Sequence, residues 1–259
     1  MSKKSNYIAK QADANGAIQY SDEEHETWRI LMGRQMPLVN QYACAEYLDA
    51  LEKLSLPGTY IPQCDTLSKQ LKAASGWQVA PVPALINFKT FFAMLANKFF
   101  PAASFIRSRE ELNYLQEPDI FHEIVGHTPL LTNTRFATFT QNIGQLGQQA
   151  DESQYVWIAR LYWFTVEFGL LNEKALGAGL ISSFSELQSS VESDTPIRKP
   201  FDLMEVLRTP YRIDIHQPVY YVLESLDQLL ELGKQDLLGA IEEAKKLGLH
   251  APLYAETKS

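Results

Sequence analysis

The stretch PDIFHEIVGHTPLL, residues 118–131, places two histidines five positions apart, with an acid beside the first, in an otherwise apolar run. In an ideal α-helix, residues i and i+4 lie about 40° apart around the axis, whereas residues i and i+5 lie about 140° apart. His122 and His127 therefore lack the HExxH spacing of the zinc proteases. They can converge on one metal ion if the helix ends or loosens between them, and Gly126 and Pro129 supply such an ending.

The two histidines can also be read as core residues that hydrogen-bond to backbone, which is the commoner case for a lone histidine on an apolar face. Because the chain has only 5 histidines, two of them beside an acid leave these interpretations evenly balanced. A third residue favours the metal. Glu167 is the one acid in ARLYWFTVEFGLL, residues 159–171, and its charge would be expensive to bury there without a partner.

Two histidines and one carboxylate form the facial ligand set of non-haem iron(II) oxygenases, which leaves positions open for oxygen and water. The same ligand types can hold zinc in a hydrolase. An ion pair between Glu167 and an arginine such as Arg160 would need no metal. Spacing alone does not separate these alternatives.

Composition limits the class of protein. The 259 residues, 46% of them hydrophobic, can bury the core of one large domain or two small ones. Lysine and arginine number 23 against 31 acids, without a basic stripe, so we expect no nucleic-acid partner. The richest apolar run, residues 91–106, is broken by Lys98 and Pro101. We therefore expect a soluble, cytoplasmic chain with no membrane span, and its two cysteines, Cys44 and Cys64, to be free thiols.

Apolar periodicity predicts a mostly α-helical chain with a minor, short β element. The first helical pattern, residues 21–54, has a capping box at Ser21 and Glu24 and an expected break at Pro37. Further helical patterns cover residues 65–74, 88–99, 136–148, 153–171, 219–232 and 235–247. The strand candidates are residues 78–79, 180–181 and 211–215, and residues 193–200 have the composition of a loop. We expect one domain over residues 1–259, with residues 1–20 as an extended arm.

Four longer motifs resemble the catalytic domain of the aromatic amino acid hydroxylases, the pterin-dependent iron monooxygenases of phenylalanine, tyrosine and tryptophan. They are EPDIFHEIVGH (117–127), LYWFTVEFGLL (161–171), GAGLISSFSEL (177–187) and QPVYYVLES (217–225). The resemblance extends upstream through EEHETW (23–28), YACAEY (42–47), IPQ (61–63) and FIRSREELNYLQEPD (105–119), so it covers nearly the whole chain. The chain is most similar to the short bacterial phenylalanine 4-hydroxylases, and we expect neither a regulatory domain nor a tetramerisation helix.

The resemblance implies a metal site and a substrate site. His122, His127 and Glu167 fall where the family holds its iron. Arg107 falls where the family receives the substrate carboxylate, which suits the bidentate fork of arginine. The substrate-site matches are Arg107, Tyr114, Pro118, Trp163, Phe168 and Ser182.

The resemblance also implies a pterin site and a reaction. Phe91 matches the phenylalanine that stacks on the pterin, and Glu123 and Tyr162 are the expected catalytic side chains near the pterin and the iron. The implied reaction converts L-phenylalanine to L-tyrosine with O₂, Fe(II) and a tetrahydropterin, either tetrahydrobiopterin or a bacterial analogue. Tyrosine or tryptophan hydroxylation is the alternative within the family, and a zinc hydrolase is the alternative from another class. A monomer or weak homodimer is expected.

Overall fold

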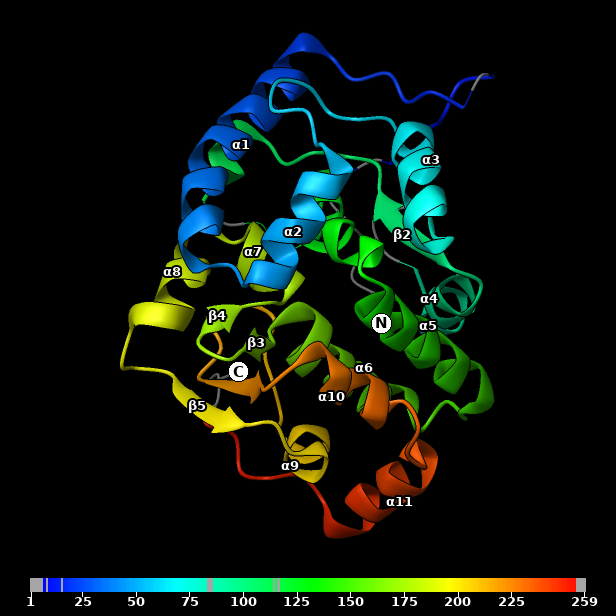
Figure 1. The fold of residues 1–259 in the computed structure, drawn as a ribbon, viewed down its shortest axis with the longest axis vertical. Coiled ribbons are helices and arrows are strands. Elements are labelled where there is room, and N and C mark those ends of the chain that lie inside the picture. Colours follow the sequence, from blue (N-terminus) through cyan, green and yellow to red (C-terminus); the bar gives the residue numbers. More distant parts are fainter. Residues whose placement is uncertain are drawn as a thin grey trace.

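Helices make up most of the computed structural model, which describes residues 7, 9–14, 16–82, 86–113, 115 and 117–254 (Figure 1). The mostly α-helical class with a minor β element is confirmed. The α-helices are α1 Asp22–Tyr42, α2 Ala45–Leu54, α3 Cys64–Ser75, α4 Phe88–Ala96, α5 Thr134–Gln149, α6 Tyr155–Tyr162, α7 Ala178–Ser182, α8 Phe184–Glu192, α9 Leu203–Arg208, α10 Leu226–Leu232 and α11 Leu237–Leu247.

Four further helical segments are not α-helical. Arg109–Glu111 (η1) and Pro129–Thr132 (η3) are short 3₁₀ helices, whereas His122–His127 (η2) and Trp163–Glu167 (η4) are π-helical. π-helical turns are rare and are frequently found at functional sites. The two π segments therefore indicate where in the fold a functional site is expected.

Two small sheets complete the architecture. Strands β1 Gln78–Val82 and β2 Phe99–Ala103 pair in parallel, with Gln78 opposite Phe99. The second sheet has the order β4-β3-β6-β5, and its strands are β3 Leu170–Leu171, β4 Lys174–Ala175, β5 Ile197–Pro200 and β6 Val219–Leu223. Strand β3 begins three residues after the end of η4, so this sheet lies close in the chain to a π segment.

Helix α1 begins at the predicted capping box, in which Ser21 and Glu24 cap each other's backbone. The predicted break at Pro37 is wrong, because the helix continues to Tyr42. Proline removes only one backbone hydrogen bond, to Gly33 four residues earlier, and a buried apolar face holds the helix on both sides of it. That face comprises Trp28, Leu31, Met32, Val39 and Tyr42.

The other departures from prediction lie mainly in the C-terminal half. Residues 219–223 form β6 rather than helix, and residues 180–181 lie in α7 rather than in a strand. Residues 211–215 form no regular element, and the predicted loop 193–200 contains β5. Continuous apolar runs such as VYYVL do not show which periodicity they follow, since they are buried on both sides.

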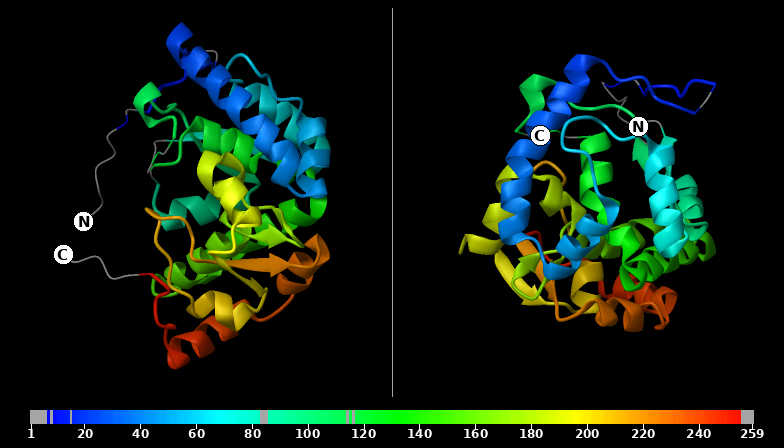
Figure 2. Two further views of the ribbon diagram at one scale, coloured as in Figure 1. Left: turned by 90° about the vertical axis from the view of Figure 1, so that its left-hand side faces the viewer. Right: turned by 45° about the horizontal axis from the view of Figure 1, so that its top comes forward.

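One cluster of buried apolar side chains connects both sheets and most helices. Its largest fully buried members include Trp28, Trp77 and Tyr47. Cys44 and Cys64 are buried, free thiols, as predicted. The start of α1 and the C-terminal helix α11 lie at opposite ends of the molecule (Figure 2).

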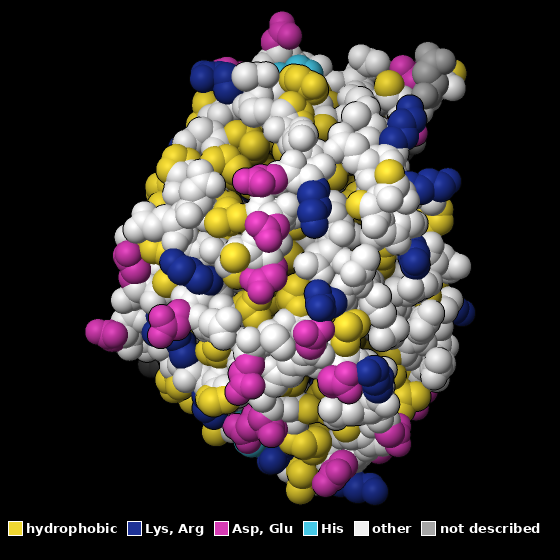
Figure 3. Space-filling view, viewed as in Figure 1, with side chains coloured by type: hydrophobic (Ala, Val, Ile, Leu, Met, Phe, Trp, Pro, Cys, Tyr) yellow, Lys and Arg dark blue, Asp and Glu magenta, His cyan; other side chains and the backbone are white. Residues whose placement is uncertain are grey.

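The surface of one face intersperses Lys and Arg side chains with acidic ones (Figure 3). Among the described residues, no helix is both long and apolar enough to cross a membrane.

Candidate active site

The two histidines of HEIVGH lie side by side because η2 is π-helical. A π-helix bonds residue i to residue i+5, so side chains five apart come one turn apart on the same face. The Nε2 atoms of His122 and His127 are 3.1 Å apart. The expected loosening therefore occurs, but as a widened helix over all six residues and not as a helix end at Gly126.

Glu167, the last residue of η4, completes the cluster. Its Oε1 atom lies 3.1 Å from His127 Nε2, and its Oε2 atom lies 3.6 Å from His122 Nε2. Neighbouring donors on an octahedral ion, with metal–ligand lengths of roughly 2.1 Å, would be about 3 Å apart. The three donor atoms are thus spaced to share one ion. The alternative pairing of Glu167 with Arg160 is wrong, since Arg160 lies over the ring of Trp157 at 4.7 Å.

A second acid, Glu123, lies beside this cluster. Donor atoms of His122, Glu123 and His127 lie within 4.8 Å of one another, so two carboxylates are available to a metal. Burial raises the pKa of Glu123 well above its usual range, and the nearby carboxylates of Glu167 and Asp119 raise it further. Burial also acts to raise the pKa of Glu167, but His127 and His122 outweigh it and lower that pKa. Glu167 is the ionised acid and the better ligand.

Ser182 orients His122. Its hydroxyl donates to the carbonyl of Ala178 at 2.8 Å and lies 2.8 Å from His122 Nδ1. Because the hydroxyl proton is already donated to Ala178, the Ser182 oxygen accepts a hydrogen bond from Nδ1–H, which leaves the lone pair on Nε2 facing the cluster. Burial lowers the pKa of His122 to about 4. The imidazole is therefore held neutral, which is the form that binds metal.

Small residues allow α7 to approach both π segments. A Cβ atom on Gly126 would lie 2.9 Å from the carbonyl oxygen of Ala178, and one on Gly177 would lie 2.2 Å from that of Glu167. A Cβ atom on Gly179 would lie 2.6 Å from the ring of Phe168. The glycines of the GAG segment are thus required for the close packing that brings Ser182 to His122.

Arg107 forms a fork with Asp119, a residue that the sequence did not single out. Arg107 donates from Nε to Oδ2 at 2.8 Å and from Nη2 to Oδ1 at 2.9 Å. Asp119 Oδ1 also accepts from the backbone N–H of His122 at 3.1 Å. One edge of the guanidinium is therefore occupied, and Nη1 has no hydrogen-bond partner among the described residues. A buried acid three residues before His122 was the available signal for Asp119.

The expected ring-binding aromatics form a stack beside η4. The ring of Trp163 lies 4.5 Å from that of Phe168 and 4.3 Å from that of Tyr211. Trp163 Nε1 donates to Gln217 Oε1 at 3.1 Å. Tyr211 and Gln217 were not anticipated. Pro118 is partly buried and precedes Asp119, whereas Tyr114 lies outside the described residues.

The expected pterin residues form a row of rings that leads to the metal cluster. Phe91 meets Tyr162 edge to face at 5.4 Å, and Tyr162 stacks on His127 at 6.3 Å. The Tyr162 hydroxyl is buried and has no hydrogen-bond partner among the described residues. Burial raises the pKa of Tyr162 well above its usual range, so this orphan hydroxyl is a donor available to a bound group.

Comparison with known proteins identifies the family. Residues 2–236 match the biopterin-dependent aromatic amino acid hydroxylases. The chain is 50% identical to phenylalanine-4-hydroxylase of Pseudomonas aeruginosa, over 97% of each protein. It superposes on the cold active phenylalanine hydroxylase of Colwellia psychrerythraea with a TM-score of 0.93 and 49% identity, over 95% of this chain and 97% of that one. The Chromobacterium violaceum phenylalanine hydroxylase with bound oxidized Fe(III) gives a TM-score of 0.89 and 37% identity, over 96% and 92%. The chain belongs to the biopterin-dependent aromatic amino acid hydroxylase family.

Proposed function

We propose that this protein is a phenylalanine 4-monooxygenase, which converts L-phenylalanine to L-tyrosine with O₂, Fe(II) and a tetrahydropterin. The convergence of His122, His127 and Glu167, with donor atoms 3.1–3.6 Å apart, supports this proposal most directly. The names of the bacterial relatives support phenylalanine as the substrate. When bound, the iron and the pterin supply the activation of O₂ and the two electrons that the reaction needs.

The protein's part in the proposed metal site is to offer two imidazoles and one carboxylate. His122, His127 and Glu167 would hold the iron, and Ser182 keeps His122 in the tautomer that presents Nε2. With only these three protein ligands, the metal would keep coordination positions open to other ligands.

In this proposal, Arg107 and the aromatic stack beside η4 bind and orient the substrate. Asp119 fixes one edge of the Arg107 guanidinium, so that the Nη1 side can receive the amino acid carboxylate. Trp163, Phe168 and Pro118 would form walls against the substrate ring, with Tyr114 and Ser182 completing the site. Fixing both the carboxylate and the ring would hold the substrate in one orientation within the site.

We assign the pterin to the row of rings formed by Phe91 and Tyr162. Phe91 would stack on the cofactor, and the unpartnered hydroxyl of Tyr162 would donate a hydrogen bond to a bound group. Glu123, held protonated by burial, would donate another. Buried apolar neighbours exclude water from these groups, which strengthens their electrostatic interactions.

A competition assay tests the reaction and its rivals. Fe(II)-loaded protein receives tetrahydropterin, O₂ and equal amounts of phenylalanine, tyrosine and tryptophan, with products separated by chromatography. We expect tyrosine as the main product, and none without pterin or under nitrogen. Dihydroxyphenylalanine or hydroxytryptophan as the main product would instead show that the enzyme prefers tyrosine or tryptophan. Activity that persists without pterin and O₂ would favour the zinc hydrolase.

The proposal extends to the protein as a whole. We expect a single catalytic domain over residues 1–259, in the cytoplasm, as a monomer or weak homodimer. Sedimentation velocity over a range of protein concentrations tests the last point, and a concentration-independent tetramer would overturn it.

A further inference from the structure

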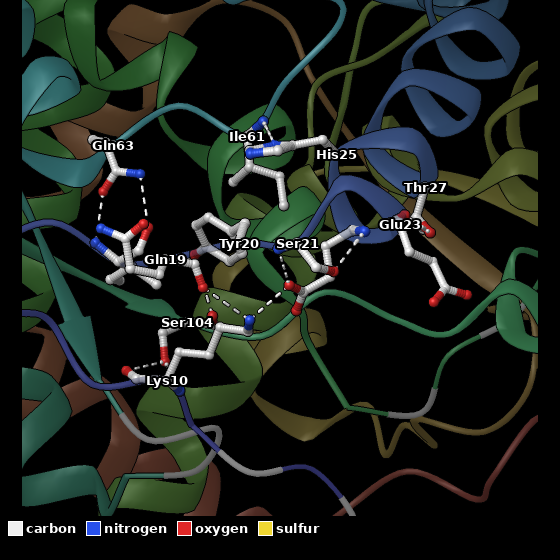
Figure 4. A network of polar contacts seen from close by, with 12 residues as sticks. Lys10, Gln19, Tyr20, Ser21, Glu23, His25, Thr27, Ile61, Gln63 and Ser104 are labelled. Carbon is white, nitrogen blue, oxygen red and sulfur yellow. Dashed lines mark hydrogen bonds and ion pairs between the residues drawn. The ribbon is translucent and has the colours of Figure 1, made fainter.

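The N-terminal arm, residues 7, 9–14 and 16–20, is hydrogen-bonded to the end of β2. Ser104, which is 1% exposed, accepts from the backbone N–H of Lys10 at 2.8 Å and donates to the carbonyl of Lys10 at 3.1 Å. The carbonyl of Ser104 accepts from the hydroxyl of Tyr20 at 3.1 Å (Figure 4). Three hydrogen bonds thus converge on one buried residue, three positions before Arg107.

The arm is itself anchored to two helices. Lys10 Nζ lies 2.6 Å from Glu24 Oε2 in the first turn of α1. The backbone of Ile18 exchanges two hydrogen bonds with the side chain of Gln63, at 2.8 and 3.0 Å, just before α3 (Figure 4). Because of these anchors, the contacts with Ser104 connect the segment after β2 to the helical body.

The start of the arm contacts the far end of the same segment. The ring of Tyr7 stacks on that of Phe105, with centroids 4.2 Å apart and planes 11° apart. The hydroxyl of Tyr7 donates to Glu111 Oε2, which also accepts from the hydroxyl of Ser108 at 2.9 Å. The arm therefore contacts residues 104–111 at both ends.

Arg107 lies between these two attachments in a segment with little regular structure of its own. Only Arg109–Glu111 is helical, in a single 3₁₀ turn. A segment without a ladder of backbone hydrogen bonds takes its shape from tertiary contacts. Asp119 holds the Arg107 side chain and its backbone N–H, the latter at 2.9 Å, while the arm contacts Ser104 and Phe105 on one side and the side chain of Glu111 on the other.

We propose that the N-terminal arm positions the amino acid substrate by fixing the segment that carries Arg107. This inference rests on the proposed function, in which Arg107 receives the substrate carboxylate. Tyr7 and Tyr20 are positioning residues: they fix residues 104–111, and bidentate recognition of a carboxylate depends strongly on where the guanidinium lies.

The test is the double variant Tyr7→Ala/Tyr20→Phe in the full chain. We expect the KM for L-phenylalanine to rise about tenfold, since a stack and two hydrogen bonds to the segment are lost, with kcat and bound iron unchanged. The matched control is Tyr42→Phe. It removes a tyrosine hydrogen bond of 2.7 Å to Glu192 from the other end of α1, and its KM should stay at the wild-type value.

A second measurement separates positioning from general loosening. The inhibition constant of 2-phenylethylamine, which lacks the carboxylate, should change little in the double variant, whereas the KM for L-phenylalanine rises. An unchanged KM, or equal losses for both ligands, would overturn the proposal. If the wild type itself does not prefer phenylalanine to 2-phenylethylamine, the assignment of Arg107 fails instead. Should the double variant not fold, Tyr20→Phe alone gives the same comparison, with a rise of about fivefold expected.

Discussion

At the metal cluster the chain offers two carboxylates, and we expect only one of them to hold iron. Glu167 is ionised because His127 and His122 lower its pKa against the effect of burial, whereas burial keeps Glu123 protonated. Glu167→Gln should therefore reduce iron affinity and activity together, by more than the roughly 10- to 100-fold of an outer-shell change. Glu123→Gln should bind iron as the wild type does. Anaerobic titration with Fe(II) checks both variants, and similar losses in the two would contradict the assignment.

The guanidinium of Arg107 should matter through its shape as well as its charge. Arg107→Lys keeps the charge but cannot form the fork with Asp119, so we expect the KM for L-phenylalanine to rise by about tenfold or more. Asp119→Asn should have a smaller effect in the same direction, because an amide retains one acceptor. Steady-state kinetics at saturating pterin measures the KM of both variants. An unchanged KM in the lysine variant would remove Arg107 from the substrate site.

His122 should make the metal-free protein sensitive to mild acid. Burial lowers its pKa from 6.5 to about 4, so between these values the unfolded chain binds a proton that the folded chain does not. The stability that the folded protein gains from keeping His122 neutral is therefore fully present above pH 6.5 and is lost as the pH falls toward 4. At pH 5 the loss should be about 2 kcal/mol relative to pH 7.5. Urea denaturation at both pH values, with a chelator present to keep the proteins metal-free, measures the free energy of unfolding of the wild type and of His122→Gln. The variant should lose less stability over this interval.

Residue types and their spacing suggested His122, His127 and Glu167, because charges and imidazoles in apolar runs need partners. The same reasoning missed Asp119, Tyr211 and Gln217. Gln217 meets Trp163 from 54 positions away, and no local pattern encodes such a contact. Arg107 forms a fork with Asp119 of the protein itself, and its fork with the substrate carboxylate stays a prediction.

Among the elements, the two π segments explain why spacing alone was ambiguous. Standard periodicity assumes 3.6 residues per turn. On that assumption the two histidines of HEIVGH would lie on different faces of the helix and could not bind the same ion. The widened turns of η2 and η4 are held by packing against α7, which comes about 50 residues after η2 in the chain, so the local sequence could not reveal them. Helices with clear amphipathic patterns, such as α3, α5 and α11, lie within two residues of their predicted bounds.

The contact between α7 and η4 should be intolerant of any added side chain. A Cβ atom on Gly177 would lie 2.2 Å from the carbonyl oxygen of Glu167, and its nearest neighbours are all backbone atoms, which cannot rotate away as a side chain could. We expect Gly177→Ala to lower the free energy of unfolding by about 2 kcal/mol or more and to weaken iron binding. Gly33→Ala on α1, where nothing lies within 4 Å of the added atom, should instead stabilise the protein by up to about 1 kcal/mol. Urea midpoints of the two variants should therefore move in opposite directions.

At the scale of the whole molecule, the proposed site is assembled from segments that are far apart in the chain. The N-terminal arm contacts the segment of Arg107, the π segments bring in the metal ligands, and residues 211–217 close over Trp163. The resemblance of motifs to a known family suggested which residues form the metal, substrate and pterin sites, and periodicity predicted the helical class. Neither predicted the contacts of the N-terminal arm or of residues 211–217. That residues 1–259 form one domain stays a prediction.

Iron should stabilise the entire fold, because its proposed ligands belong to η2 and η4, and the metal would join these two segments directly. A ligand that binds only the folded state at about 1,000 times its Kd adds roughly 4 kcal/mol to the free energy of unfolding. We expect an increment of this size with saturating Fe(II) under nitrogen, measured by urea denaturation, and its reversal by a chelator. The increment should vanish in Glu167→Gln. It should be reduced in Ser182→Ala, which removes the 2.8 Å contact with His122 Nδ1, and be retained in Tyr42→Phe. An equal increment in all four proteins would place the iron elsewhere on the chain.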